Sequence, residues 1–231
     1  MRRHCIVSLL LIAVAVFPFP GCTTVPATAH GPHAAGDWLL LPMPREFEVS
    51  ATVAGRAAIA GTFASVHTVI DADRVPHAQG YDLTIAAARG RAPIVRVTAH
   101  DDAGAFYAEQ TLMQLEQQAR AKGCVPLCRI VDWPDFPDRG VMLDVARCKV
   151  PKMKTLYELV DLFASWKYNQ IQLYTEHTFA YRNHPTVWHD ASPMTPAQVR
   201  DLDAYCRARY IQLVPNQNSF AHMGRWLMHP E

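Results

Sequence analysis

The residues best suited to chemistry lie in the second half of the chain, at the ends of three apolar segments. The segments span residues 140–145, 169–175 and 211–215, and each has the length of a buried strand. The polar residues at or just after their ends are Asp144, Arg147, Glu176, His177, Asn218 and His222. A carboxylate beside a histidine can tune proton transfer. Buried strands that end in polar residues are typical of a parallel α/β barrel, whose ligands bind at the carboxyl ends of the strands.

Residues 132–147 carry the most specific pattern in the chain. They read D-W-P-D-F-P-D-R-G-V-M-L-D-V-A-R, which closely resembles the start of the catalytic barrel in glycoside hydrolase family 20, the β-N-acetylhexosaminidases. The resemblance implies that Arg147 binds hydroxyl groups of a terminal sugar, which suits a guanidinium because it can donate two parallel hydrogen bonds. Two interpretations of Asp144 remain open. It orients Arg147 or pins the strand end, or it is a structural acid paired with Arg139 or Arg147.

The ends of the next two segments depart from the family pattern. Members usually carry a His-rich strand followed by two aspartates, whereas this chain has Glu176 and His177, which either tune proton transfer or form a structural ion pair. The third segment continues as P-N-Q-N-S-F-A-H and aligns without gaps on the family's P-E-x-D-x-P-G-H, with Asn216 and Asn218 in place of both acids. The resemblance implies that His222 supports the catalytic glutamate by a hydrogen bond, and the alternative is a surface histidine.

Catalysis in the family, as the resemblance implies it, is substrate-assisted and retaining. The sugar's 2-acetamido oxygen attacks the anomeric carbon, an aspartate stabilises the ring that forms, and the neighbouring glutamate protonates the leaving oxygen. This Asp–Glu pair follows the fourth barrel strand in the family, and the 231 residues here end just after the third predicted strand. We therefore expect the N-terminal part of an enzyme that removes terminal N-acetyl-hexosamines, with its catalytic pair beyond Glu231 and with this chain inactive by itself. No cofactor and no metal are expected.

A protein without turnover is the alternative hypothesis. The amides at Asn216 and Asn218, together with the missing acid pair, favour a non-catalytic, lipid-anchored carbohydrate-binding protein. The reading frame after Glu231 discriminates between the two, because five further β/α units and an Asp–Glu pair would indicate the enzyme. Under both hypotheses the partner is a glycan or an amino sugar.

Residues 37–133 predict a small α+β domain. Four short segments alternate or are apolar like strands, and a helix is expected over residues 105–121, after a possible N-terminal cap at Asp101 or Asp102. Residues 104–115 resemble the helix that ends the non-catalytic N-terminal domain of the family.

Residues 134–231 predict the first β/α units of a (β/α)8 TIM barrel, which is incomplete here. The three strand segments are separated by two expected helices, at residues 151–167 and 196–209. Thr195 is expected to cap the second helix together with Gln198. The order strand–helix–strand–helix–strand with short connections predicts a parallel sheet.

Composition and charge exclude some classes of partner. Half of the residues are hydrophobic and 19% are charged, as in a globular protein with a sizeable core. The formal net charge is +1 and the chain has no basic run. A nucleic-acid partner is therefore not expected.

The first 36 residues resemble an export signal and a tether. A short basic stretch precedes an apolar run over residues 6–16 that is too short to span a bilayer, and Cys22 follows it. We interpret residues 1–21 as a lipoprotein signal, Cys22 as the lipidation site and residues 22–36 as a tether. An ordinary secretory signal and an uncleaved anchor are the alternatives. The expected location is the bacterial periplasm or the outer membrane or cell surface, with membrane contact only through the lipid.

Export would place the remaining cysteines in an oxidising compartment. Cys124 and Cys128 are four residues apart, with a proline between them. They either close a small disulfide loop or are two buried residues that flank a turn. Zinc is a poor alternative, because no second closely spaced pair completes a four-ligand set.

Overall fold

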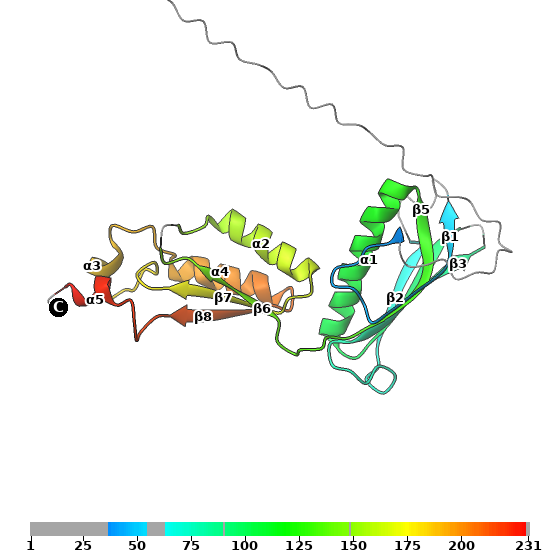
Figure 1. The fold of residues 1–231 in the computed structure, drawn as a ribbon, viewed down its shortest axis with the longest axis horizontal. Helices are drawn as coiled ribbons and strands as arrows, with labels where there is room; N and C mark the ends of the chain where they lie inside the picture. The colour runs from blue at the N-terminus through cyan, green and yellow to red at the C-terminus, as the bar shows by residue number, and fades with distance from the viewer. Residues whose placement is uncertain (1–36, 55–62, 90, 148, 230–231) are drawn as a thin grey trace, which may run out of the picture.

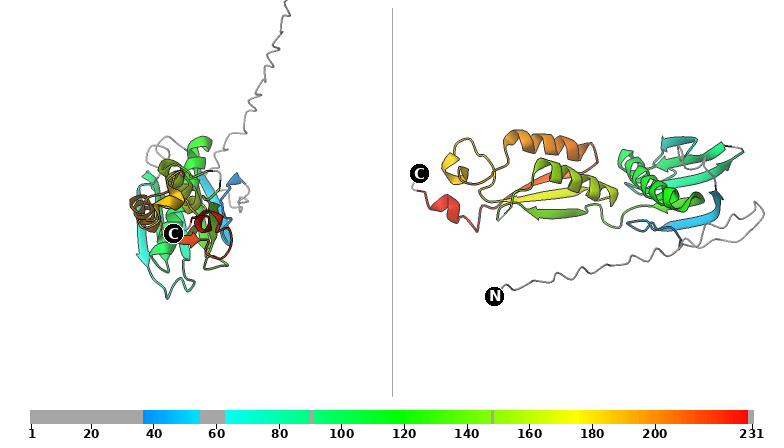
Figure 2. Two further views of the ribbon diagram at one scale, coloured as in Figure 1. Left: turned by 90° about the vertical axis from the view of Figure 1, so that its left-hand side faces the viewer. Right: turned by 90° about the horizontal axis from the view of Figure 1, so that it is seen from above.

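The computed structural model describes residues 37–54, 63–89, 91–147 and 149–229. These residues form two regions that lie end to end (Figures 1 and 2). The predicted signal peptide, the tether and the lipidation site Cys22 lie outside the described residues. Among the described helices, none is both long enough and apolar enough to cross a membrane.

The N-terminal region is a five-stranded sheet with one long helix packed on one face (Figure 1). The strand order is β1-β5-β3-β4-β2, and all neighbours are antiparallel except β2 and β4. The elements are β1 (Glu46–Ala54), β2 (Ser65–Ile70), β3 (Tyr81–Ala88), β4 (Arg91–Ala99), α1 (Asp102–Lys122) and β5 (Cys124–Asp132). Sheet residues Leu83, Ile85 and Ile130 form the core with Leu115 of α1. The four strands and the helix that the sequence predicts are present in this region, and the sheet has a fifth strand, β5.

Helix α1 begins and ends as its sequence indicates. The Asp101 carboxylate accepts a hydrogen bond from the Gly104 N–H at 2.7 Å, which satisfies one of the free donors of the first turn. Gly123 ends the helix in a left-handed conformation, with φ of 69°, which glycine adopts without a Cβ clash.

Strand β5 was not expected from the sequence, and it corrects both interpretations of Cys124 and Cys128. Both cysteines lie on this one strand, so no turn separates them, and their Cα atoms are about 13 Å apart at the usual rise of an extended chain. That separation is too long for a disulfide. Cys128 is buried and free. A Cys124–Cys128 loop is therefore wrong.

The second region is a three-stranded parallel sheet in the order β6-β7-β8, with two helices packed on one face. The elements are β6 (Gly140–Asp144), α2 (Met153–Ser165), β7 (Gln170–Thr175), α3 (Pro185–Trp188), α4 (Pro196–Arg207), β8 (Gln212–Gln217) and α5 (Gly224–Leu227). The predicted parallel alternation of strands and helices is confirmed, as is the capping box of Thr195 and Gln198. Within the described residues it forms an open sheet, so the complete barrel stays a prediction.

The two faces of this sheet differ in polarity. Ile171 and Leu173 of β7 point toward the helices and are buried with Leu156 of α2 and Leu202 of α4. The opposite face carries Gln172, Tyr174 and Asn216 among others, and Met142 there is 59% exposed. The polar face ends at the carboxyl ends of the strands, where the predicted site residues lie.

Candidate functional site

Arg147 lies just beyond the carboxyl end of β6 and is held there by acids. Its Nη1 donates to Asp144 Oδ2 at 2.5 Å, and its Nη2 lies 3.8 Å from Glu176 Oε1. The other oxygen of Asp144 accepts a hydrogen bond from the Ala146 N–H at 2.9 Å. Asp144 thus both contacts Arg147 and binds the backbone that leaves the strand. The alternative pairing with Arg139 is wrong, because Arg139 bonds to Lys167, Phe136 and Gln79 at the other end of the sheet.

Glu176 is joined to the end of β8 through a tyrosine. The Tyr174 hydroxyl donates to Glu176 Oε1 at 2.8 Å and accepts from Asn218 Nδ2 at 2.6 Å. The Arg147 guanidinium lies 5.7 Å from the centre of the Tyr174 ring. Parallel pairing brings these groups together, because Asp144 is opposite Tyr174 and Tyr174 is opposite Asn216. The ends of all three strands therefore share one chain of polar contacts.

His177 takes no part in this chain of hydrogen bonds among the described residues. Its side chain is buried, and its Nδ1 atom has no hydrogen-bond partner among the described residues. Burial lowers the pKa of His177, and the nearby positive charge of Arg225 lowers it further, while Glu176 and Asp190 oppose both effects. The neighbouring Thr178 hydroxyl is also buried without a partner in this part of the described chain. Buried polar atoms without partners are uncommon and mark places where a ligand, water or another chain segment can bind.

His222 is exposed and has the left-handed φ of 52°. No hydrogen bond or ion pair joins it to Arg147, Glu176 or His177 in the described part of the chain. The turn that leads to it is held by Asn218, whose Oδ1 accepts from the Ala221 N–H at 3.1 Å. The structure therefore brings Asp144, Arg147, Glu176 and Asn218 together, and leaves His177 buried and His222 exposed beside them.

Three further residues at this end were missed from the sequence. Gln217 donates to the Glu176 carbonyl at 3.0 Å and accepts from the Tyr181 hydroxyl. Trp226 Nε1 donates to the same carbonyl at 2.8 Å. Tyr174 could have been found, because it shares a strand face with Gln172 and Glu176 at a spacing of two residues. Gln217 and Trp226 carry no such signal, since only the tertiary structure brings them to Glu176.

Within the described residues, no cluster of three or more histidine, cysteine, aspartate or glutamate side chains is arranged to hold a metal. Two cavities, of about 170 and 440 Å³, lie at the other end of the sheet, where Arg139 lines both. Neither is lined by the residues of the candidate site. The strand ends, with free donors and unpartnered atoms, are the better candidate for chemistry.

Comparison with known proteins supports the assignment of both regions. Residues 12–133 match the family described as glycosyl hydrolase family 20, domain 2, and residues 136–231 match its catalytic domain. Beta-hexosaminidase 1 of Coccidioides posadasii is 29% identical over 153 residues, and a beta-hexosaminidase of Akkermansia muciniphila is 30% identical over 138 residues. These alignments cover 62% and 52% of this chain, but only 25% and 28% of the relatives.

Solved structures agree with this assignment. A glycoside hydrolase family 20 β-N-acetylglucosaminidase superposes with a TM-score of 0.60 at 27% identity, over 76% of this chain and 41% of that one. The N-acetyl-β-hexosaminidase of Streptomyces plicatus shares the fold with a TM-score of 0.64 at 19% identity, over 88% of this chain and 49% of that one. The chain spans about a quarter of the length of the curated relatives it matches. The chain therefore belongs to glycosyl hydrolase family 20, as domain 2 followed by part of the catalytic domain.

Proposed function

We propose that this chain supplies the sugar-binding arginine of a β-N-acetylhexosaminidase that removes terminal N-acetyl-hexosamines by substrate-assisted, retaining catalysis. The observation that carries the proposal is the placement of Arg147. Asp144 holds one side of its guanidinium, and the side chain is still 56% exposed at the carboxyl end of the sheet. Apart from Asp144 and the more distant Glu176, no described residue bonds to the guanidinium, so it keeps N–H groups that can donate to two adjacent sugar hydroxyls.

Glu176 and Asn218 complete this proposed subsite. Glu176 lies close enough to Arg147 to limit its movement, and Tyr174 and Asn218 fix the Glu176 carboxylate in turn. The catalytic Asp–Glu pair is proposed to come from a part of the enzyme outside this chain, so the 231 residues alone should not hydrolyse a chromogenic N-acetylglucosaminide. We propose that His222, which is exposed after the end of β8, accepts a hydrogen bond from that catalytic glutamate or donates one to it.

The test is Arg147→Lys in a protein that contains the whole catalytic domain. Lysine keeps the charge but loses the paired donors, so kcat/KM should fall about ten- to a hundredfold, as expected for a lost hydrogen bond to a charged group. Arg207→Lys is the matched control, because Arg207 also pairs with an aspartate, 2.9 Å away on the outer helix α4, and is similarly exposed. Equal kinetics in the two variants would remove Arg147 from the site.

A second candidate, a carbohydrate-binding protein without turnover, is favoured by one observation. Asn216 and Asn218 occupy positions where the family pattern has acids, and both amides are engaged in hydrogen bonds, Asn216 with Gln172 and Asn218 with Tyr174. Neutral amides can bind a sugar but cannot transfer a proton at neutral pH. If a protein with the complete barrel binds N-acetylglucosamine without cleaving the chromogenic glycoside, this candidate replaces the first.

Export by a lipoprotein signal is also proposed, from the sequence of the first 22 residues. The mature protein would begin at a lipidated Cys22 and lie outside the cytoplasm, where terminal amino sugars of glycans are accessible. Mass spectrometry of membrane-extracted protein tests this. An intact Met1, or unchanged processing of a Cys22→Ser variant, would contradict it.

A further inference from the structure

Lys167 has a backbone conformation that lysine rarely adopts. It follows the last turn of α2 with φ of 60°. The Lys167 N–H bonds to the Ala164 carbonyl at 2.9 Å, and the Tyr168 N–H bonds to the Phe163 carbonyl at 3.0 Å. These two bonds form the helix ending in which glycine is the usual left-handed residue. A side chain with a Cβ is strained there, so its surroundings must hold it in place.

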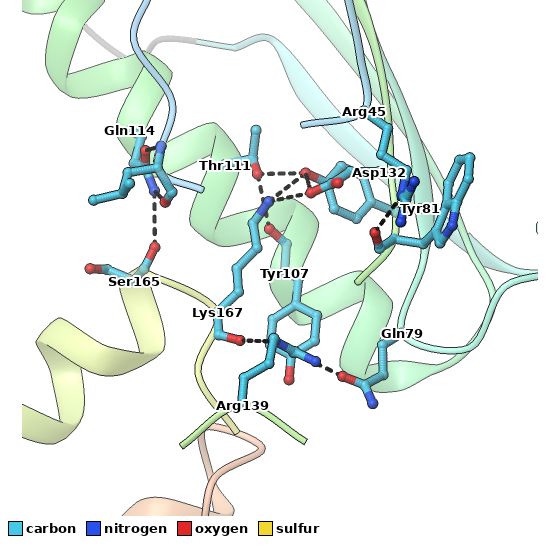
Figure 3. Close-up of polar contacts among 12 residues, drawn as sticks. Arg45, Gln79, Tyr81, Tyr107, Thr111, Gln114, Asp132, Arg139, Ser165 and Lys167 are labelled. Carbon is cyan, nitrogen blue, oxygen red and sulfur yellow. Dashed lines mark hydrogen bonds and ion pairs between the residues drawn. The ribbon is translucent and has the colours of Figure 1, made fainter. Parts of the chain in front are cut away.

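The Lys167 side chain crosses into the N-terminal domain, as Figure 3 shows. Its Nζ donates to Asp132 Oδ2, at the end of β5, and to the Tyr81 hydroxyl, at the start of β3, both at 2.8 Å. The Tyr81 oxygen lies 2.7 Å from Thr111 Oγ1 of α1. All four side chains are buried, with Lys167 only 5% exposed. An ion pair between the two domains is thus enclosed within protein.

Because these groups are buried, the pKa of Lys167 and that of Tyr81 both depend on the nearby charge of Asp132. Desolvation lowers the pKa of Lys167, and the charge of Asp132 opposes that shift. Burial likewise raises the pKa of Tyr81, and Asp132 raises it further. A buried ion is costly without its partner, so removing either member of the pair should be far more damaging than removing an exposed pair.

The backbone beside Lys167 is bound as well. Arg139 donates to the Lys167 carbonyl at 2.9 Å and to Gln79 Oε1 at 2.9 Å, and Gln114 of α1 donates to the Ser165 carbonyl at 2.9 Å (Figure 3). The connection from α2 to β7 is therefore held by the Lys167 side chain and by hydrogen bonds to the carbonyls of Lys167 and Ser165. All of these contacts reach residues of the N-terminal domain directly or through Arg139.

Helix α4 ends in the same way as α2. Tyr210 follows α4 with φ of 55°, and the Ile211 N–H bonds back to the Cys206 carbonyl at 3.0 Å. The Tyr210 ring packs against Phe106 of α1, with centroids 5.3 Å apart. Both helix–strand connections at the amino end of the sheet thus place a left-handed, non-glycine residue against the N-terminal domain.

We infer that Lys167 and Asp132 form a latch that joins the two domains into one cooperative unit, in which the N-terminal domain holds the α2–β7 connection and so positions β7. The latch defines a role for the N-terminal domain that does not depend on the proposed glycosidase activity. If the inference is correct, unfolding of either domain should also expose the hydrophobic core of the other.

Two buried cysteines report on this coupling, one in each core. Cys128 lies in the N-terminal core and Cys206 in the core of the second region, and both are free. Burial raises the pKa of Cys128 to about 12 and that of Cys206 to about 11, so both thiols are unreactive until their domain opens. Alkylation of the full chain with iodoacetamide, followed by mass spectrometry of the two peptides, measures each opening separately.

The unmodified chain gives the first test. In a series of urea concentrations, the latch predicts that Cys128 and Cys206 become reactive over the same range. Two separate ranges, with one domain open while the other protects its cysteine, would overturn the inference. This measurement needs no variant, so it stands even if a substitution at the latch prevents folding.

Variants at Lys167 give the second test. Lys167→Met leaves Asp132 buried without its partner and should speed alkylation at both cysteines about a hundredfold or more. The control is Lys154→Met on the same helix, where the lysine is 86% exposed and faces Glu158 at 3.8 Å; it should change the rates by about twofold at most. Acceleration at Cys206 alone, with Cys128 unchanged, contradicts the latch.

Lys167→Gly separates the side chain from backbone strain. Glycine fits the left-handed conformation better than lysine, so relief of strain by itself would slow alkylation. The latch predicts faster alkylation at both cysteines in this variant, because Asp132 again loses its partner. Slower alkylation would show that position 167 matters only for its backbone.

Discussion

The two ends of the three-stranded parallel sheet are built in opposite ways. At the amino end, Arg139, Asn169 and Lys167 bond to carbonyls, amides and a carboxylate, and the ion pair there is enclosed. At the carboxyl end, Arg147 is more than half exposed, and His177 Nδ1 has no partner among the described residues. One end satisfies its polar groups within the protein, whereas the other keeps donors and acceptors available.

This difference separates stability from function along a single sheet. Strands in a parallel barrel present their amino ends to supporting structure and their carboxyl ends to ligands. In this chain the supporting structure is the N-terminal domain, which lies at the amino end of the sheet in the described part of the chain (Figure 1). Substitutions of the same type at the two ends should therefore have different consequences.

The largest contrast is expected between two arginines. Arg139→Met removes donors to the Lys167 and Phe136 carbonyls and to Gln79, and should lower the free energy of unfolding by about 2–3 kcal/mol. Arg147→Met removes an exposed pair with Asp144 and should cost about 1 kcal/mol or less. Urea unfolding followed by tryptophan fluorescence measures both. Equal losses, or a larger loss for Arg147→Met, would refute the division between the two ends.

A smaller effect is expected from the pH dependence of His177. Burial lowers its pKa in the folded protein, so the folded state binds fewer protons than the unfolded state. Stability is then fully present above the unfolded pKa of about 6.5 and is lost as the pH falls through the lower folded value. The urea midpoint should fall less between pH 7 and pH 5 in His177→Gln than in the unmodified chain.

The exposed His189 supplies a control for that measurement, because it lies in the same region of the fold. The pH dependence of His177→Gln is compared with that of His189→Gln. If the two variants show the same pH dependence, then burial of His177 does not contribute to it, and the lowered pKa of His177 is contradicted.

The smallest effect is expected from restoring a family acid at position 218. An Asn218→Asp side chain cannot donate to the Tyr174 hydroxyl when ionised, and it adds a negative charge near Glu176. We expect a loss of about 1 kcal/mol at pH 7 that shrinks toward pH 4 as the carboxyl is protonated. The exposed Asn183→Asp change serves as a control. A gain of stability at pH 7 would mean that the carboxyl end is preorganised for an acid.

Local patterns in the sequence determined much of the fold. The alternation of strands and helices, the cap at Asp101 and the capping box at Thr195 were all predictable, because they depend on residues a few positions apart. The placement of Arg147 and Glu176 at neighbouring strand ends was also predictable, because parallel pairing follows from the order of the elements. The motif from Asp132 to Arg147 was specific enough to indicate the family by its residue types and spacing alone.

Strand β5 shows where local patterns end. It contains Pro126 and two cysteines, and most of its side chains are buried on both faces, so it lacks the alternation of a half-exposed strand. Its neighbours β1 and β3 lie more than 40 positions away in the sequence along most of their length. Only long-range pairing makes it a strand.

The tertiary structure also decided what Asp132 and Lys167 do. A lysine after a helix, next to Trp166, has the sequence appearance of a solvated helix end, and Asp132 has that of an acid in a proline-rich linker. The two are 35 positions apart, and no periodicity connects them. Burial between two domains converts two ordinary surface charges into an ion pair that neither can lose without cost. The sequence by itself therefore determined the family and most of the elements, and the tertiary structure decided the pairing of β5 and which charges hold the two domains together.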